Sequence, residues 1–310
     1  HEFAQFCANS GMEHLPVIFL GTGHKSFKNH GLASDAVHFS TLEARVNEIP
    51  LQTEGLEDII AAIVHQKKDS PEWNKIVAPY TGIFSHFAKE CKRLNLFNWL
   101  PAPKLKANII ENIYPMHPLA TYALLQLAGE AGSDNRSVFK FFSPEFETGE
   151  TGWINVQEFS YPWFTERNDI EADGKLNLYT EDLLYDYFRD SLKTDNRNLR
   201  DRVRKAVADY EETLKEMLAY LKKDSQMKLF DEVDELMHKI LKAMLINEII
   251  STESTPVHNT LENIKFALNA LSVQDAQALE ERLKRLCQAT ILYNNKGIYE
   301  FKRSDVVDIE

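Results

Sequence analysis

The sequence predicts a mainly α protein that begins with a small α/β part. Over most of the chain, apolar residues recur every three or four positions, which favours amphipathic helices. One early run, Leu15 to Leu20 (LPVIFL), is continuously apolar and is typical of a strand buried on both faces. Near the carboxyl end, three helical segments precede a short β-hairpin pattern. These observations divide the chain into an α/β beginning, a helical middle and a helical end with a hairpin.

Length and composition are those of a globular protein of about two domains. The chain has 310 residues, of which 44% are hydrophobic and 26% charged, and its net charge is −12. This charge argues against general binding of polyanions by the chain as a whole. No apolar run approaches the roughly 18 residues of a transmembrane helix. The cysteines Cys7, Cys91 and Cys287 show no metal-ligand spacing, so a reduced, cytoplasmic protein is expected.

The amino end predicts a helix over residues 1–14 and a strand over 15–20, followed by the turn Gly21 to Ser26 (GTGHKS). A phosphate-binding loop reads GxxxxGK[ST] after a strand, because its amides cradle the phosphates. Here His24 stands where glycine should precede the lysine, so a complete nucleotide-binding loop is rejected for this chain. The chain also opens without Met in mid-pattern, as expected of a fragment. Because ligands bind at the carboxyl ends of strands in open sheets, Thr22 and His24 stay candidates for ligand contact; the alternative is a tight turn with solvated side chains.

The next segment is Phe39 to Leu51 (FSTLEARVNEIPL). It predicts a short helix capped by Ser40 or Thr41, then Arg45 and an extended stretch. The planar guanidinium of an arginine is always charged and suits contact with a phosphate. The ordinary alternative for an isolated arginine is a solvated surface residue.

The helical middle starts with residues 54–64. Their pattern predicts an amphipathic helix with one apolar face, made of Leu56, Ile59, Ile60 and Ile63. Residues 65–71 predict a polar break, residues 83–100 an aromatic-rich helix, and residues 101–103 a proline-containing linker.

The stretch from residue 114 to 142 predicts a helical hairpin that organises the chain. Pro115 and Pro118 suit a first helical turn, where the missing N–H of proline has no partner to lose. An apolar helix follows and stops near Gly129 and Gly132. A second helix begins at Asp134 or Asn135, which are good capping residues.

His117 and Arg136 stand at the two helix entrances of this hairpin. Helix entrances carry unpaired amides and a partial positive charge, which suit phosphates or the polar edge of a nucleotide. The ordinary alternative is structural: His117 caps or packs between helices, and Arg136 pairs with Asp134 or Glu130.

This hairpin resembles the lid segment of the large bacterial P-loop ATPases of phage-exclusion (BREX, Pgl) and related defence systems. The family carries a "YPLHPLTALLL" helix followed by an "NERSLFSFL"-like helix, and the matching residues here are Tyr114, Pro115, His117, Pro118, Leu119, Asn135, Arg136, Ser137, Phe139 and Phe142. The resemblance covers residues 1–65, 110–142 and 231–310 better than 144–230.

The resemblance implies the C-terminal portion of an AAA+ or STAND-like ATPase. Residues 1–52 would then be the end of the P-loop core, 53–143 a helical lid, 144–230 an insertion and 231–310 a winged-helix domain. The implied site residues are Thr22 and His24 as γ-phosphate sensors, Arg45 as a catalytic finger toward the neighbouring subunit, His117 with Pro118 over the adenine, and Arg136 as a second sensor. ATP and Mg²⁺ would bind in the intact parent, and no cofactor is expected in this chain alone.

Residues 144–178 mix glycines and aromatic residues and predict irregular loops with a short strand at 153–156. Asp169, Glu171 and Asp173 alternate there, but the ligand number and distal Glu of a calcium loop are missing, which favours a solvated acidic turn. Residues 198–221 predict a long helix of mixed charge.

The carboxyl end predicts a winged helix. Helical patterns cover residues 230–250, 260–269 and 275–287, and residues 291–301 form a hairpin pattern with Asn-Lys-Gly at its turn. In the third helix, Glu280 and Glu281 stand against three basic residues, Arg282, Lys284 and Arg285. A protein-docking winged helix is therefore at least as well favoured as a DNA-binding one.

The expected function is nucleotide-dependent switching in a multisubunit assembly, with the remainder of the ATPase or its other subunits as partners, DNA as a further candidate partner and no membrane contact. The alternative is a non-enzymatic helical and winged-helix module for protein or DNA interaction.

Overall fold

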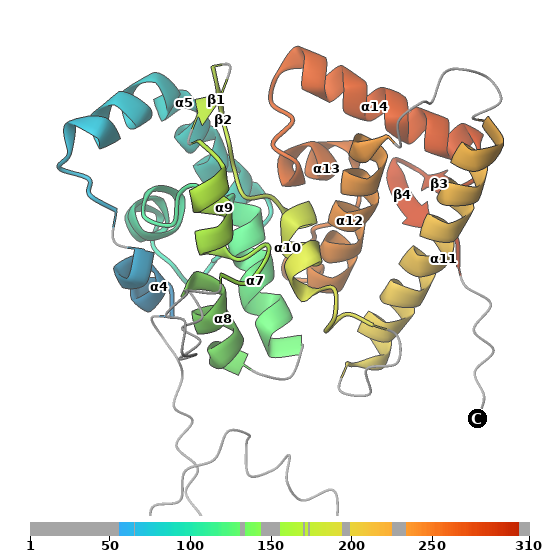
Figure 1. Cartoon of the computed structure of the whole chain (residues 1–310), viewed down its shortest axis with the longest axis horizontal. Coiled ribbons are helices and arrows are strands. Elements are labelled where there is room, and N and C mark those ends of the chain that lie inside the picture. Colours follow the sequence, from blue (N-terminus) through green and yellow to red (C-terminus); the bar gives the residue numbers. More distant parts are fainter. Residues whose placement is uncertain are drawn as a thin grey trace, which may run out of the picture. The chain divides into compact units, whose positions relative to one another are not determined.

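The computed structural model describes residues 56–64, 66–130, 134–143, 156–169, 171–172, 174–193, 199–224 and 234–303, and these are mainly helical (Figure 1). The helices expected in residues 1–51 and the buried strand at 15–20 lie outside the described residues. Residues 57–310 belong to one compact unit, to which nearly all of the described residues belong.

Among the described residues, the amino-terminal half contains six helical elements: α4 (Leu56–Val64), α5 (Pro71–Arg93), α6 (Ala102–Lys104), the π-helix η2 (Leu105–Glu111), α7 (Pro118–Glu130) and α8 (Asp134–Phe142). The helical hairpin expected at residues 114–142 is confirmed by α7 and α8, and Pro118 is the first residue of α7.

Helix α5 corrects the expected boundaries of residues 65–103. It begins at Pro71, because the Ser70 hydroxyl caps it by accepting a hydrogen bond from the Trp73 amide at 3.1 Å. It also continues through Pro79 and ends at Arg93. The expected helix at 83–100 therefore starts twelve residues late and ends seven late. Of the expected linker at 101–103, Ala102 and Pro103 belong to α6 instead, and Pro101 is the residue before this helix.

Helix α4 confirms the expected helix but not its apolar face. Ile60 has no exposed area, whereas Ile59 and Ile63 are 48% and 40% exposed. The face buried by the described part of the chain includes Glu57 and Ala61 instead. The apolar face expected from periodicity therefore lies one residue position away from the face that the structure buries.

The carboxyl-terminal half follows the order α9 (Tyr161–Arg167), β1 (Glu171–Ala172), β2 (Lys175–Leu176), α10 (Glu181–Phe188), α11 (Asp201–Asp224), α12 (Glu235–Ile250), α13 (Leu261–Ala267), α14 (Val273–Gln288), β3 (Leu292–Asn295) and β4 (Ile298–Phe301). The helices expected near 198–221, 230–250, 260–269 and 275–287 are confirmed as α11 to α14. Helix α9 lies in the region expected to be irregular. The Ser160 hydroxyl caps this helix by accepting a hydrogen bond from the Trp163 amide at 3.4 Å. The strand expected at 153–156 is not tested, because residues 153–155 are outside the described part.

The hairpin at residues 291–301 is confirmed. Strands β3 and β4 pair antiparallel, with Leu292 opposite Phe301 and Asn295 opposite Ile298. The two turn residues, Lys296 and Gly297, have φ of 51° and 91°. Positive φ at both central positions matches the twist of a two-residue hairpin, and glycine adopts it without strain.

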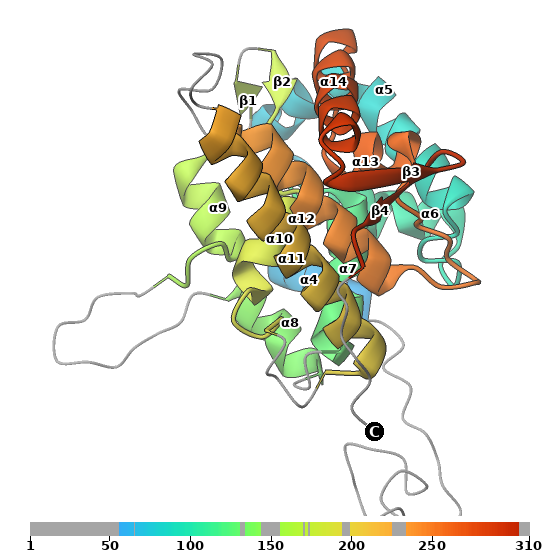
Figure 2. The same ribbon diagram turned by 90° about the vertical axis from the view of Figure 1, so that its right-hand side faces the viewer.

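Two helices, α7 and α12, form the centre of this unit. Helix α7 packs against α5, α8, α10, α12 and α13, and α12 packs against α10, α11, α13 and α14. Helices α10, α11 and α12 lie side by side (Figure 2). Both central helices are buried around most of their circumference, as expected of helices that are apolar on every face. Segments from residues 56–143, 174–193 and 234–303 therefore share one core.

Candidate functional site

Of the residues proposed for nucleotide contact, the structure describes His117, Pro118 and the backbone of Arg136. Thr22, His24 and Arg45 lie outside the described residues. His117 directly precedes the first residue of α7, whereas Arg136 lies in the first turn of α8, which follows α7 in the chain. The 13 residues of α7 separate the two helix entrances by about 20 Å of helix. The structure does not bring these two backbone positions together, and the Arg136 side chain is outside what is described.

His117 is an internal residue of the unit. Its side chain has no exposed area, and its ring lies edge-to-face against Phe87 of α5 at 4.9 Å and Phe266 of α13 at 4.5 Å between centroids. Its Nδ1 accepts a hydrogen bond from the Leu119 amide at 3.2 Å and so caps α7, while Nε2 has no partner in the described part of the chain. Pro118 is buried as well. In this conformation neither side chain is open to a ligand from solvent.

Burial keeps the His117 ring neutral. Loss of hydration, and secondarily the charge of nearby His86, lowers the pKa of His117 from 6.5 to about 3. A neutral ring can accept the Leu119 amide hydrogen at Nδ1, whereas a doubly protonated ring cannot. The capping role therefore depends on the neutral form.

The loop that precedes α7 is held by a short stretch of β-type pairing. The His117 amide donates to the Tyr179 carbonyl at 2.9 Å, and the Tyr179 amide donates to the Pro115 carbonyl at 3.0 Å. These bonds form a parallel bridge between Met116 and Tyr179. The buried Tyr179 hydroxyl also donates to the Phe159 carbonyl at 2.6 Å. The loop is thus fixed to the segment that leads into α10.

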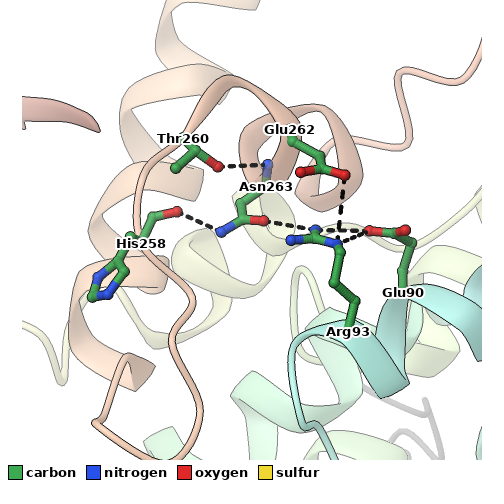
Figure 3. Close-up of polar contacts among 6 residues, drawn as sticks. All are labelled: Glu90, Arg93, His258, Thr260, Glu262 and Asn263. Carbon is green, nitrogen blue, oxygen red and sulfur yellow. Dashed lines mark hydrogen bonds and ion pairs between the residues drawn. The ribbon is translucent and has the colours of Figure 1, made fainter. Parts of the chain in front are cut away.

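A polar cluster joins the end of α5 to α13 (Figure 3). Arg93 donates from Nε to the Glu90 carboxylate and from Nη2 to the Asn263 side-chain oxygen, both at 2.7 Å. The Glu262 carboxylate lies 3.5 Å from Nε. The Asn263 side-chain amide in turn donates to the His258 carbonyl at 2.7 Å. The cluster fixes α5 and α13 against each other on either side of the His117 ring.

A pocket of about 190 Å³ lies beside the loop that precedes α7. Four segments form it: the start of α5, the loop itself, α9, and the residues on either side of the β1–β2 hairpin. Its lining residues are Gln66, Trp73, Tyr114, Pro115, Tyr161, Phe164, Thr165, Asn168, Asp169 and Asn177. Of the motif that marked this region in the sequence, Tyr114 and Pro115 line the pocket, and His117 and Pro118 do not.

Several side-chain donors around this pocket are directed to backbone carbonyls. The Tyr161 hydroxyl donates to the Tyr114 carbonyl at 2.9 Å, and the Gln66 amide group donates to the same oxygen. The Asn168 amide group donates to the Phe164 carbonyl at 2.9 Å, and that of Asn177 to the Asp169 carbonyl at 2.6 Å. These bonds leave the side-chain oxygens of the three amide groups as acceptors near the pocket.

Sequence reasoning missed most of this pocket. The aromatic residues of 144–178 were read as parts of irregular loops, and Trp73 lay between the expected polar break at 65–71 and the expected helix at 83–100. The one available indication was the density of aromatic and amide residues between Tyr161 and Asn177. Their convergence on Trp73 depends on a chain separation of almost ninety residues.

Other chemistry is limited in the described part of the chain. No group of three or more His, Cys, Asp or Glu side chains there could hold a metal ion. Burial raises the pKa of the Cys91 thiol to about 12, so this cysteine is a core residue and a poor nucleophile. No described helix has the length and apolar character needed to cross a bilayer.

Comparison of the chain with family models, with curated proteins and with solved structures finds no match in any of the three.

Proposed function

We propose that this chain is the C-terminal portion of an ATP-binding P-loop ATPase similar to those of the BREX and Pgl defence systems. In this proposal the chain acts in the cytoplasm, within a multisubunit assembly, and couples the nucleotide state to a change of conformation. Residues 1–52 end the ATPase core, residues 53–143 form the lid, and residues 231–310 form a winged helix that docks other subunits. The support is the order of the sequence motifs together with the mainly helical fold.

One observation carries the coupling role. The His117 ring is enclosed between Phe87 of the lid segment and Phe266 of the C-terminal segment, at 4.9 and 4.5 Å. The Arg93 cluster joins the same two helices (Figure 3). Because close-packed side chains transmit displacement with little give, a lid movement would carry the C-terminal helices with it. Such a rigid connection suits an element that reports a nucleotide state.

The proposed chemistry lies outside this connection. ATP and Mg²⁺ would bind the intact parent, with Thr22 and His24 as sensors and Arg45 as a finger toward a neighbouring subunit. His117 would set the position of the α7 entrance by capping it. Arg136 would respond to the phosphates from the entrance of α8.

The test is ATP hydrolysis by the complete gene product. We expect Arg45→Ala to lower kcat by about a thousand-fold while ATP binding changes little, because the finger stabilises transition-state charge. Arg303→Ala, at an exposed arginine, is the matched control and should hydrolyse ATP normally. Unchanged turnover in Arg45→Ala would reject the finger role. Absence of ATP binding by the complete gene product would reject the proposal as a whole.

A second candidate is a non-enzymatic module for protein interaction. Helix α14 favours it, because Val273 at its start is 73% exposed and the preceding Leu271 is 40% exposed. In the same helix, Arg282 is already paired with Asp234 at 2.7 Å and Glu281 at 3.5 Å. An exposed apolar start with a neutralised arginine suits a protein partner better than DNA phosphates. The ATP-binding measurement above separates the two candidates.

A further inference from the structure

The pocket beside the α7 loop has aromatic walls. Trp73, Tyr114, Tyr161 and Phe164 come from three segments that are distant in the chain. Trp73 and Tyr114 meet edge-to-face, with centroids 6.2 Å apart and planes at 75°. Aromatic faces carry partial negative charge and attract cations, most strongly when water is displaced. The walls therefore favour a flat or cationic group over an anion.

The polar atoms of the pocket also favour a cationic group over an anion. The amide groups of Gln66, Asn168 and Asn177 each use one N–H donor on a backbone carbonyl, and each group also carries a side-chain oxygen that can accept. Asp169 adds a carboxylate at the exposed edge and forms no ion pair within the described part of the chain. A donor-rich, positively charged ligand satisfies such a set of acceptors, whereas a phosphate would be repelled.

No lysine or arginine contributes to the described lining, and two basic residues close to it along the chain are engaged elsewhere. Lys68 donates to the Ala107 carbonyl at 3.0 Å and lies 3.6 Å from Glu111. Arg167 lies over the Trp163 ring at 5.2 Å and beside Glu166 at 3.7 Å. The negative charge at the pocket edge is therefore not cancelled by these two side chains.

We infer that this pocket binds a guanidinium group, and that its occupant is an arginine side chain of a partner protein. A guanidinium is planar, so it stacks on aromatic rings, and its five N–H donors can reach several acceptors at once. A volume of about 190 Å³ accommodates one such group but not a nucleotide with its phosphates. This inference is independent of the ATPase proposal, because it rests only on the pocket.

The first experiment compares two neutral-backbone probes, N-acetyl-arginine methylamide and its citrulline counterpart, in titrations of the complete 310-residue chain. Citrulline keeps the shape and loses the charge. The reporter is the Trp73 indole N–H resonance, assigned by its loss in Trp73→Phe. We expect a saturable shift with the arginine probe and about ten-fold weaker binding of the citrulline probe. Equal binding of both probes, or no shift with either, would overturn the inference.

The second experiment uses a matched pair of variants. Asp169→Asn removes the carboxylate at an exposed position, and we expect about five-fold weaker binding of the arginine probe. Glu166→Gln is the control, because Glu166 is exposed on α9 and does not line the pocket; its binding should equal that of the unmodified chain. If the two variants weaken binding equally, general electrostatic attraction explains the result and the site is rejected. Retained melting temperatures establish that both variants are folded.

Discussion

At the scale of single residues, the structure changes the meaning of the most conspicuous motif residue. His117 was a candidate for contact with adenine, and in the structure it is a buried neutral cap enclosed by two phenylalanines. The ring still sits at the entrance of a central helix. Its influence on any ligand would therefore pass through the position of α7.

This burial makes stability depend on pH. The unfolded His117 protonates below its ordinary pKa of 6.5, whereas the folded ring stays neutral down to about 3. The unfolded state therefore binds more protons in this window, and stability is lost as pH falls. His117→Asn keeps a capping oxygen but cannot titrate. We expect the difference in unfolding free energy between the original chain and His117→Asn to shrink by about 2 kcal/mol between pH 7.5 and 5.

Urea denaturation at several pH values measures this difference. The control is His258→Asn, because the His258 ring is exposed and its carbonyl, which accepts from Asn263, is unchanged. The curves of the control and of the original chain should run parallel. If the unfolding free energy of His117→Asn also varied with pH in parallel with that of the original chain, the His117 ring would be hydrated in solution.

Glu181 is a second buried polar residue whose state the sequence did not indicate. It has no exposed area, and neither carboxylate oxygen has a partner among the described residues. Burial, and then the charge of Asp182, raises the pKa of Glu181 well above its ordinary value. The folded state therefore favours the protonated carboxyl group. The stability gained from holding this proton is lost as pH rises above the ordinary value near 4.5.

At the scale of elements, Arg93 attaches α5 to α13 through a cluster of polar contacts. Glu90 is only 6% exposed, and its carboxylate accepts a hydrogen bond from Arg93 Nε at 2.7 Å. Arg93→Ala would leave this carboxylate and the Asn263 oxygen without their donor. We expect a loss of about 2 kcal/mol in unfolding free energy.

Denaturation followed by circular dichroism checks this value. Lys92→Ala is the matched control, since Lys92 is exposed in the same turn, and it should change stability by less than about 0.5 kcal/mol. The double variant Glu90→Ala with Arg93→Ala should lose less than the sum of the single changes, because removing both partners leaves no unpaired charge. Strict additivity would show that the two side chains act independently.

At the scale of the whole molecule, the expected lid and the expected winged helix share one core. Helix α7 packs on α12 and α13, and the β3–β4 hairpin closes on α14 and α11. Among the described residues, the packing is therefore continuous between the expected lid and the expected winged helix. Movement of one part relative to the other would require the core to open.

The sequence also predicts whether the 310-residue chain binds ATP. The sequence lacks the glycine before Lys25 that a phosphate-binding loop requires. We expect calorimetric titration of the 310-residue chain with ATP and Mg²⁺ to detect no site of micromolar affinity. The complete gene product, under the same conditions, should bind ATP. A tight site in the 310-residue chain would show that it carries a nucleotide site of another kind and would remove the basis of the fragment proposal.

The sequence by itself determined the local elements with strong periodic or turn patterns. Helices α7, α11, α12 and α14 follow from apolar spacing, and the β3–β4 hairpin follows from Lys296 and Gly297, because these signals act between neighbouring residues. Helix α5 shows the limit of such reasoning. Its start depends on the Ser70 cap, and its passage through Pro79 contradicts local propensity.

Only the tertiary structure decided the environments of the candidate residues. His117 is enclosed because Phe87 and Phe266, 179 positions apart in the sequence, meet around it. The aromatic pocket likewise needs Trp73, Tyr114 and Phe164 to converge from separate segments. Burial, pKa and ligand preference arise from such long-range contacts. Periodicity along the chain carries no information about which distant faces will meet, since several pairings bury the same apolar area.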